Sequence, residues 1–246
     1  MNDVVKTERD GAVLRITINR PERRNALNEE VCAGIAAAID VAEASPGVRV
    51  VVLTGSGDKV FCAGGDLKPG ADGTPFVIDP ANPRHYVIQL FRRLERCGLP
   101  VIARVNGHAM AGGLGLVCAC DMAVSTDTAQ FGVPESKLGL FPMMILSYMM
   151  RIIPRRKLYE IATTGEPFSA AEALAMDIVN YVFHQWGEHK WGYDFDTLQH
   201  RLRQAGFAHV ERMSFGHSLD PRLACDRDTH APYSLYVDAV APVAGG

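Results

Sequence analysis

Alternating and periodic apolar positions divide the first half of the chain into predicted strands and helices. Residues 12–21 alternate apolar and polar side chains up to a proline, a pattern typical of a half-exposed strand. Residues 28–45 carry apolar side chains at helical spacing behind Asn28, a residue type that caps helix N-termini. The apolar run at residues 48–55 predicts a buried strand, and residues 85–98 predict an amphipathic helix ended by a glycine.

The same succession continues further along the chain. Residues 99–107 predict another strand, and residues 121–135 predict two short strands about a turn. Residues 143–182 predict two or three short helices and a closing strand, whereas residues 69–83, rich in proline, glycine and aspartate, predict a loop. This alternation of strands and helices predicts an α/β layered fold.

The pattern changes in the last quarter of the chain. From His184 onward the sequence holds both of its tryptophans, and residues 196–213 predict a helix, a glycine stop and a strand. Residues 231–242 predict a further strand with alternating side chains. We therefore expect a boundary between a domain of residues 1–183 and a segment of residues 184–246.

Composition and charge narrow the classes of function. The chain has 246 residues and a net charge of −3, which gives no electrostatic case for a nucleic-acid partner. The polar N-terminus lacks a signal-peptide core and no apolar run is long enough to span a membrane, so we expect a cytoplasmic protein without a membrane partner. The cysteines and histidines match no disulfide framework or strong metal motif, so we expect reduced thiols and no metal.

The segment HAMAGGLGLVCACD, residues 108–121, combines a buried-helix pattern with three glycines, Gly112, Gly113 and Gly115. Each glycine inside a helix costs about 0.5–1 kcal/mol relative to alanine. One interpretation is that a helix N-terminus presents its free N–H groups to an anion or to a developing oxyanion. The alternative is that the glycines let the helix pack closely on its neighbours.

A second glycine segment, FCAGGDLK at residues 61–68, follows a predicted buried strand. Two such loops can direct two backbone N–H groups at one oxygen, and each donor of an oxyanion hole contributes about 3–4 kcal/mol in a transition state. The alternative is a pair of ordinary strand-to-helix turns. Neither segment has the Gly-Lys-Ser/Thr ending of a phosphate loop or the Gly-x-Gly-x-x-Gly spacing of a dinucleotide site.

Several motifs then occur in one order along the chain: NRPERRNALN (19–28), FCAGGDLK (61–68), NGHAMAGGLGLVCACD (106–121), FGVPESKLGLFP (131–142) and TGEPFSAAEALAMDIVNYV (164–182). Together they resemble the enoyl-CoA hydratase/isomerase (crotonase) superfamily over about residues 5–183. The resemblance implies an α/β fold with a crotonase-like ββα spiral core and an acyl-CoA thioester as substrate. It implies no cofactor beyond the coenzyme A of that substrate, and a homo-oligomer, either a trimer or a hexamer.

The resemblance also implies roles for individual positions. The backbone N–H groups of Gly65 and Gly112 are expected to hold the thioester oxygen and to stabilise an enolate. The coenzyme A groove is expected to be lined by Arg23, Arg24, Ala26, Ala63, Gly64, Asp66, Leu67 and Lys68. Arg23, Arg24 and Lys68 are candidate partners for phosphates, with solvated surface charge as the alternative. The substrate pocket is expected to include His108, Met110, Gly115 and Leu140; His108 can instead be a satisfied, partly buried histidine.

Acid–base chemistry falls on one carboxylate in this sequence. Hydratases of the family commonly use two glutamates; Glu135 matches the second place, whereas Gly115 stands in the first and cannot transfer a proton. Close to Phe131, Val133 and the leucines that follow, the pKa of Glu135 is expected to be raised toward the range useful to a proton carrier. The alternative is a surface carboxylate.

Three functions stay open from the sequence. Hydration of a 2-enoyl-CoA is expected first, a double-bond shift by the single glutamate second, and acyl-CoA binding without catalysis third. The third hypothesis rests on residues 184–246, which resemble only the last helix and strands of class I S-adenosylmethionine-dependent methyltransferases, without their glycine-rich cofactor loop. We expect this atypical α+β tail to replace the helical segment that usually builds the family's trimer.

Overall fold

The computed structural model describes residues 4–66, 85–183, 199, 203, 209–213 and 236–240. The chain divides into two compact units, Met1–Val182 and Phe183–Gly246. The division lies beside the boundary expected from the sequence. Each unit is described by itself.

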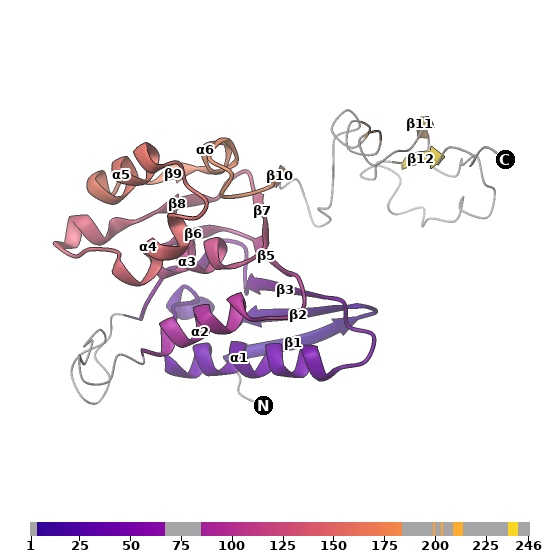
Figure 1. Cartoon of the computed structure of the whole chain (residues 1–246), viewed down its shortest axis with the longest axis horizontal. Coiled ribbons are helices and arrows are strands. Elements are labelled where there is room, and N and C mark those ends of the chain that lie inside the picture. The colour runs from indigo at the N-terminus through magenta and orange to yellow at the C-terminus, as the bar shows by residue number, and fades with distance from the viewer. Residues whose placement is uncertain are drawn as a thin grey trace. The chain divides into compact units, whose positions relative to one another are not determined.

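The larger sheet of the first unit has six strands in the order β1-β2-β3-β5-β7-β10 (Figure 1). They are β1 (Val5–Asp10), β2 (Val13–Ile18), β3 (Val50–Gly55), β5 (Val101–Val105), β7 (Met122–Thr126) and β10 (Tyr181–Phe183). β1 pairs antiparallel with β2, whereas β2, β3, β5 and β7 run parallel, with Ile16 opposite Leu53 and Leu53 opposite Ala103. These residues are fully or almost fully buried, so the inward positions of the predicted alternation form the core.

The first unit also contains a smaller sheet, and most of its strands come directly after a strand of the larger sheet in the sequence. Its order is β4-β6-β8-β9, with β4 (Val60–Cys62), β6 (His108–Met110), β8 (Gln130–Gly132) and β9 (Phe168–Ser169). β3, β5 and β7 of the larger sheet are each followed directly in the chain by a short strand of the smaller one, and β6 leads into helix α3 (Gly112–Ala119). This succession of two strands and a helix is the ββα spiral that the family resemblance implied.

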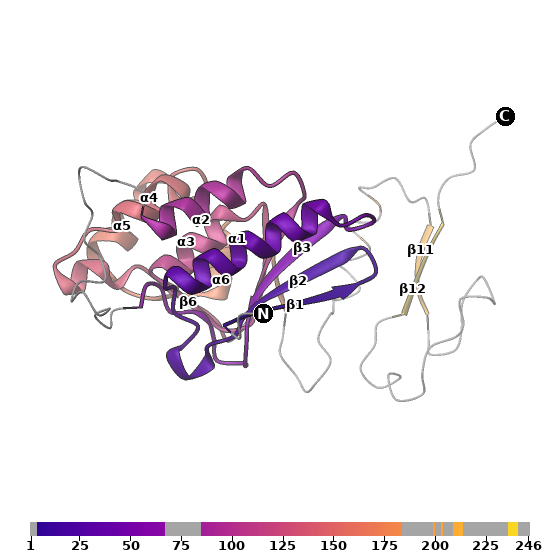
Figure 2. The ribbon, with the colours of Figure 1, turned by 90° about the horizontal axis from the view of Figure 1, so that it is seen from below.

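Helices cover the larger sheet on one face (Figure 2). α1 (Glu29–Ala44) packs on β1 and β2, and α2 (Tyr86–Glu95) packs on α1 and α3. The predicted cap of α1 is confirmed, because the Asn28 side chain accepts a hydrogen bond from the Val31 N–H at 2.9 Å. α2 ends at Glu95, three residues before the glycine that was expected to end it, because Arg96 leaves the helical conformation.

Shorter elements complete the first unit. They are the 3-10 turns η1 (Pro21–Arg23) and η2 (Pro134–Leu138) and the helices α4 (Met143–Met149), α5 (Arg155–Thr164) and α6 (Ala170–Ala175). The helix predicted in residues 108–121 is confined to α3, because its first three residues pair as β6. No helix in the described ranges is long and apolar enough to cross a membrane.

The second unit contains β11 (His209–Met213) and β12 (Tyr236–Val240), which pair antiparallel with Glu211 opposite Asp238. Both fall where the alternating pattern predicted strands. Of the predicted helix before β11, Gln199 and Arg203 are described and helical, and the remainder lies outside the described residues. The resemblance of this segment to a methyltransferase end stays a prediction.

Candidate active site

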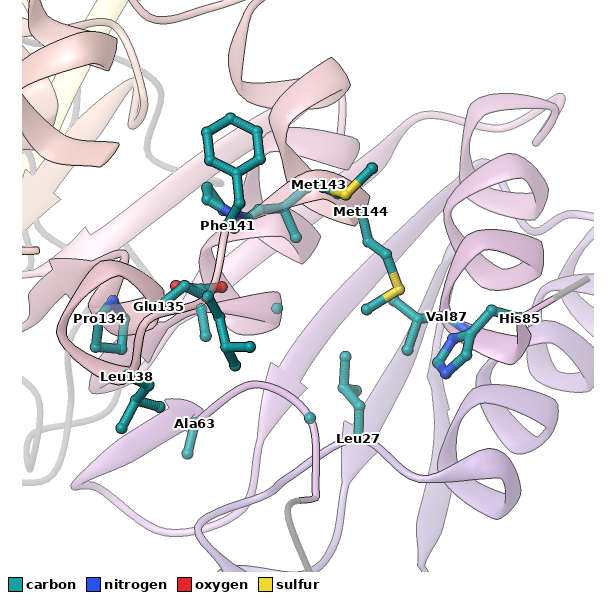
Figure 3. A pocket seen from close by; sticks show the side chains of 16 residues that line it. Leu27, Ala63, His85, Val87, Pro134, Glu135, Leu138, Phe141, Met143 and Met144 are labelled. Carbon is teal, nitrogen blue, oxygen red and sulfur yellow. The ribbon is translucent and has the colours of Figure 1, made fainter. Parts of the chain in front are cut away.

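A pocket of about 340 Å³ opens where the two sheets meet the helices (Figure 3). The loops before α1 and after β4 contribute Leu27, Ala63 and Gly65 to its wall, and the start of α3 contributes Ala111 and Gly112. The rest of the wall comes from η2, α4 and their connection and from α2, namely Pro134, Glu135, Leu138, Leu140, Phe141, Pro142, Met143, Met144, Ile145, His85 and Val87. Segments from five parts of the sequence therefore converge on one apolar cavity.

Gly65 is held in the wall by pairing between two loops. The Leu27 N–H donates to the Gly64 carbonyl at 2.7 Å, and the Asp66 N–H donates to the Leu27 carbonyl at 2.8 Å. Leu27 and Gly65 thus form a parallel bridge, in which Leu27 uses both of its polar backbone groups. In such a bridge the N–H of the opposite residue points away from its partner, so the Gly65 amide does not bond to Leu27.

Gly112 brings a second amide to the same place. It is the first residue of α3, and the N–H groups of a helix's first turn have no acceptor within the helix. A Cβ built on Gly64 would lie 3.1 Å from the Gly112 nitrogen, and one built on Gly112 would lie 3.6 Å from the Gly65 nitrogen. Within residues 4–66 and 85–183, neither the Gly65 nor the Gly112 N–H donates to another group of the protein.

The close approach of these loops requires unusual backbone conformations. Gly64 has φ +96°, and a Cβ there would lie 2.7 Å from the Ala111 Cβ. Ala111 itself has φ 51° and ψ −124°, a conformation that costs an L-residue about 1–3 kcal/mol. Its N–H donates to the Gly132 carbonyl at 2.8 Å, which ties the start of α3 to β8. The strain is stored at the turn that positions Gly112.

The three glycines of α3 differ in whether packing requires them. A Cβ on Gly113 would lie 2.1 Å from the Cys62 carbonyl oxygen, and one on Gly115 would lie 2.3 Å from Ile145 Cγ2. Those two positions therefore need glycine for packing, as one of the sequence interpretations held. A Cβ on Gly112 would meet its nearest neighbour at 3.4 Å, an ordinary contact, so packing does not require glycine there.

Glu135 is the carboxylate in the wall. It stands in η2, and Figure 3 shows it in the pocket wall beside Pro134 and below Phe141. Burial raises the pKa of its carboxyl, the direction expected from the sequence, and a hydrogen bond from its own backbone N–H partly offsets the rise. Its Oε2 is buried, and no hydrogen-bond partner for it occurs among the described residues.

Three of the four residues expected in the substrate pocket do not line it; Leu140 does. His108 and Met110 lie on the same side of β6, with the buried Ala109 on the other, and they face a second hollow. His108 Nδ1 accepts a hydrogen bond from the Gln130 N–H at 3.0 Å, which is the satisfied-histidine alternative. Gly115 is buried beneath Ile145.

The second hollow, of about 450 Å³, shares Ala63 with the pocket. Its wall includes the cationic side chains of Arg24 and Lys59, together with Asp58, His108 and Thr128. Arg24 is thus one predicted groove residue that borders open space. Leu67 and Lys68, expected in the same groove, lie outside the described residues.

Two further predicted groove residues, Arg23 and Asp66, form an ion-pair cluster with Arg20. Asp66 accepts from Arg20 at 2.9 Å and from Arg23 at 3.1 Å, so Arg23 is bound within the protein instead of standing as a solvated charge. Arg20 also donates to the Ala26 carbonyl at 2.8 Å, and Ala26 is buried. Sequence reasoning missed Arg20, which fastens the two loops that carry Leu27 and Gly65.

Sequence reasoning also missed His85 and Ile145 in the pocket wall. His85 caps α2, because its Nδ1 accepts from the Val87 N–H at 3.3 Å. The sequence pattern placed His85 inside the predicted helix of residues 85–98, and nothing in it placed the side chain beside Leu27. In the part of the chain that the structure describes, no three His, Cys, Asp or Glu side chains gather as a metal site would require.

Comparisons with known proteins agree with this arrangement. A family model described as enoyl-CoA hydratase/isomerase matches residues 8–191. A Thermus thermophilus protein named "Putative enoyl-CoA hydratase" is 38% identical over 174 residues, which are 70% of this chain and 68% of the relative.

Solved structures are similar as well. An enoyl-CoA hydratase from Mycobacterium smegmatis superposes with a TM-score of 0.67 at 36% identity, over 73% of this chain and 69% of that one. A carnitinyl-CoA dehydratase from Mycobacterium avium 104 does so with a TM-score of 0.64 at 37% identity, over 82% of this chain and 75% of that one.

Proposed function

Since this chain belongs to the enoyl-CoA hydratase/isomerase family, we propose that it adds water to a 2-enoyl-CoA through a thioester enolate. The observation that carries the proposal is that Gly65, Gly112 and Glu135 line one apolar pocket. Two amide donors and one proton carrier are the minimum that this reaction requires of a protein.

The amides act on the thioester oxygen. Attack at the β-carbon pushes an electron pair through the conjugated system onto that oxygen, where negative charge accumulates. Two N–H donors in an apolar site stabilise this charge, each by about 3–4 kcal/mol, and the positive end of the α3 dipole acts in the same direction at Gly112. Apolar side chains around the site strengthen these interactions by excluding water.

Glu135 carries the proton. As a carboxylate it removes a proton from water, and the hydroxide equivalent forms a bond to the β-carbon. The protonated Glu135 then gives its proton to the α-carbon, the enolate returns its electrons, and the thioester carbonyl reforms. A raised pKa suits both halves of this cycle, because it brings the two protonation states of Glu135 closer in free energy near neutral pH.

The second hollow is suited to the nucleotide end of coenzyme A. It meets the pocket at Ala63, and its wall carries Arg24 and Lys59. A thioester held at Gly65 and Gly112 has a path past Ala63 to these cations, which are appropriate partners for phosphates.

A double-bond shift is the second candidate, and one observation favours it. Ile145 fills the space in front of Gly115, so the pocket has an apolar side chain at the place where two-glutamate hydratases of the family carry their first acid. Glu135 alone can remove a proton from the α-carbon of a 3-enoyl-CoA and return it to the γ-carbon, with the same enolate between the two steps. This reaction needs no water.

One experiment separates these functions. The protein is incubated with crotonyl-CoA and, separately, with a 3-enoyl-CoA, while the absorbance of the conjugated thioester is followed. Loss of absorbance from crotonyl-CoA supports hydration, and a gain from the 3-enoyl-CoA supports isomerisation. Tight binding of both thioesters without turnover would overturn both and leave an acyl-CoA-binding protein.

Cytoplasmic location and a homo-oligomer belong to the same proposal. Leu138, Phe141 and Met143 are each more than 60% exposed at the pocket, although they are large and apolar. Second copies of the chain would remove such side chains from water. The molar mass in solution, measured by light scattering, tests this, and a monomer at micromolar concentration would contradict it.

A further inference from the structure

Arg20 is a largely buried cation to which the proposed mechanism gives no role. Its side chain is 12% exposed, and that of Asp66, which accepts from its Nη2, is 15% exposed. Its other terminal nitrogen, Nη1, donates to the Ala26 carbonyl at 2.8 Å. The planar guanidinium thus serves two acceptors in two directions, and one of these acceptors is the backbone beside the pocket.

A chain of hydrogen bonds leads from Arg20 to the Gly65 amide. The Ala26 carbonyl belongs to the same peptide group as the Leu27 N–H, which donates to the Gly64 carbonyl at 2.7 Å. The Gly64 carbonyl in turn shares a peptide group with the Gly65 N–H. Because the C=O and N–H of a trans peptide point in opposite directions, these two peptide groups are aligned head to tail between Arg20 and Gly65.

A cation at the start of such a chain strengthens the bonds along it. The hydrogen bond from a guanidinium is charge-assisted, and it favours the resonance form in which the peptide oxygen is negative and the nitrogen positive. The N–H of that peptide group becomes a better donor as a result, and the next group is polarised in the same way. Such cooperative strengthening is about 10–30% per bond.

The carboxylate beside Arg20 does not cancel its charge. Asp66 accepts from Arg20 at 2.9 Å and from Arg23 at 3.1 Å, so the formal charges of these three side chains leave one net positive charge. Asp66 bonds to Nη2 of Arg20, whereas Nη1 begins the chain toward Gly65. Because Arg20 and Asp66 are largely buried, water screens their field only weakly.

The base of the chain is fixed as well. The Arg20 N–H donates to the side-chain oxygen of Asn25 at 3.1 Å, and the Asn25 N–H donates to the Arg20 carbonyl at 2.9 Å. The buried Asn25 amide nitrogen donates to the carbonyls of Ser56 and Val60 at 3.0 and 2.8 Å. These bonds tie the turn that carries Arg20 to the end of β3 and the start of β4, so the guanidinium is held relative to the pocket wall.

We propose that Arg20 polarises the Gly65 N–H through the two peptide groups between them and so strengthens one of the amides that hold the thioester oxygen. This path, from Nη1 of Arg20 through Ala26–Leu27 and Gly64–Gly65, is the Arg20 relay. The inference rests on the proposed function for the oxygen at its end. Arg20 acts through backbone groups and is a positioning residue, and it supplies Gly65 with the positive potential that the α3 dipole supplies to Gly112.

The carbonyl stretching frequency of a bound thioester measures the relay. Butyryl-CoA labelled with carbon-13 at the carbonyl is followed by isotope-edited infrared spectroscopy at saturation, and the wild type is expected to lower the frequency from its value in solution. R20M keeps the bulk of the side chain without its charge or donors, and it should return the frequency part of the way. Its kcat on crotonyl-CoA should fall about three- to tenfold with a smaller change in KM, because the oxygen is most negative in the transition state. A folded R20M with the wild-type frequency overturns the inference.

Two further variants distinguish polarisation from an ion-pair clamp. D66N removes the negative charge beside Arg20 and should leave the frequency at or below the wild-type value, whereas a clamp requires D66N and R20M to raise it equally. That equality would overturn the relay. R93M is the matched control, because Arg93 also pairs with two carboxylates, Asp40 and Glu43, and joins α2 to α1 away from the pocket. It should leave both the frequency and kcat unchanged.

A second pair of variants keeps the test valid if R20M does not fold. R20K retains the charge and R20Q does not, while both retain a polar donor. R20K should therefore hold the frequency closer to the wild-type value than R20Q does, and equal frequencies in the two overturn the inference.

The spectroscopic result is independent of turnover. If crotonyl-CoA is not hydrated, the proposed function fails, and the frequency of bound butyryl-CoA in the wild type and in R20M still decides on the relay. Hydration with no difference in frequency between these two proteins overturns the relay and leaves the proposed function standing.

Discussion

The side chain of Ile145 fills the space in front of Gly115. A Cβ built on Gly115 would lie 2.3 Å from Ile145 Cγ2 and 2.9 Å from Phe91 Cζ. By its motif, position 115 is the place where two-glutamate hydratases of the family carry their first acid. Here an isoleucine from α4 lines the pocket instead, which leaves Glu135 as the one carboxylate among the described lining residues.

Packing at this contact predicts a coupled effect on stability. G115A forces a methyl group against Ile145 and is expected to lower the free energy of unfolding by about 1–3 kcal/mol. The double variant G115A/I145A should lose less stability than the sum of the losses in the two single variants, because alanine at position 145 relieves the clash with the new methyl group. Urea unfolding of the four proteins measures this, and strictly additive losses would contradict it.

G112A is expected to fold normally and to lose activity. The new methyl group would meet Gly64 Cα at 3.4 Å and Leu27 Cδ1 at 3.5 Å, which are ordinary contacts. It would also lie 3.6 Å from the Gly65 nitrogen, in the space that the thioester oxygen is proposed to occupy. We expect kcat/KM to fall about a hundredfold or more with an unchanged melting temperature. Full activity in G112A would remove the two-amide site from the mechanism.

E135Q is expected to bind acyl-CoA and to lose turnover. In the wild type the carboxylate must be ionised to accept a proton from water, so kcat/KM should fall as the pH drops through the raised pKa of Glu135. The midpoint of this acid limb should lie above the ordinary glutamate pKa of about 4.3. A pH–rate profile measures it; a limb at the ordinary value, or an active E135Q, would exclude Glu135 as the base.

The same carboxyl makes stability depend on pH. Because burial raises its pKa, the folded state holds the proton of Glu135 more tightly than the unfolded state does. Its contribution to stability is therefore full below the unfolded pKa and is lost as the pH rises through the folded pKa. E135Q lacks this loss, so its free energy of unfolding should rise relative to the wild type between acidic and neutral pH. A difference that does not change with pH would contradict this.

K59A and R24A should each weaken binding of the nucleotide end of the substrate. Both side chains line the second hollow, and neither lines the pocket. Their loss should raise KM for CoA thioesters severalfold, with kcat nearly unchanged, because the contact is equal in the ground and transition states. N-acetylcysteamine thioesters, which lack the phosphates, serve as the control and should react at an unchanged rate. Equal effects on both substrates would place the two cations elsewhere in the mechanism.

Local signals predicted the elements of the first unit well. Asn28 caps α1 as expected, and the alternating residues of β2 bury Leu14, Ile16 and Ile18. These features depend on neighbours in the sequence, where periodicity and capping act directly. The motif around Glu135 likewise led to a carboxyl whose pKa burial raises, and Leu138 and Leu140, its apolar neighbours in the chain, line the same pocket.

What the sequence could not predict depends on contacts between distant segments. Strands such as β6 have three residues, too few for an alternating pattern to show which side His108 and Met110 face. Ile145 reaches Gly115 from thirty positions away in the chain, and Arg20 reaches Asp66 from forty-six. His85 enters the pocket because α2 packs on α3, a tertiary fact that its own segment does not encode.

The contact between Ile145 and Gly115 also constrains how this protein can evolve. A glutamate at position 115 alone would collide with the isoleucine, and trimming the isoleucine alone would open a void without adding an acid. A second acid at position 115 would therefore require both residues to change together, with a smaller side chain at position 145 leaving room for the new carboxylate.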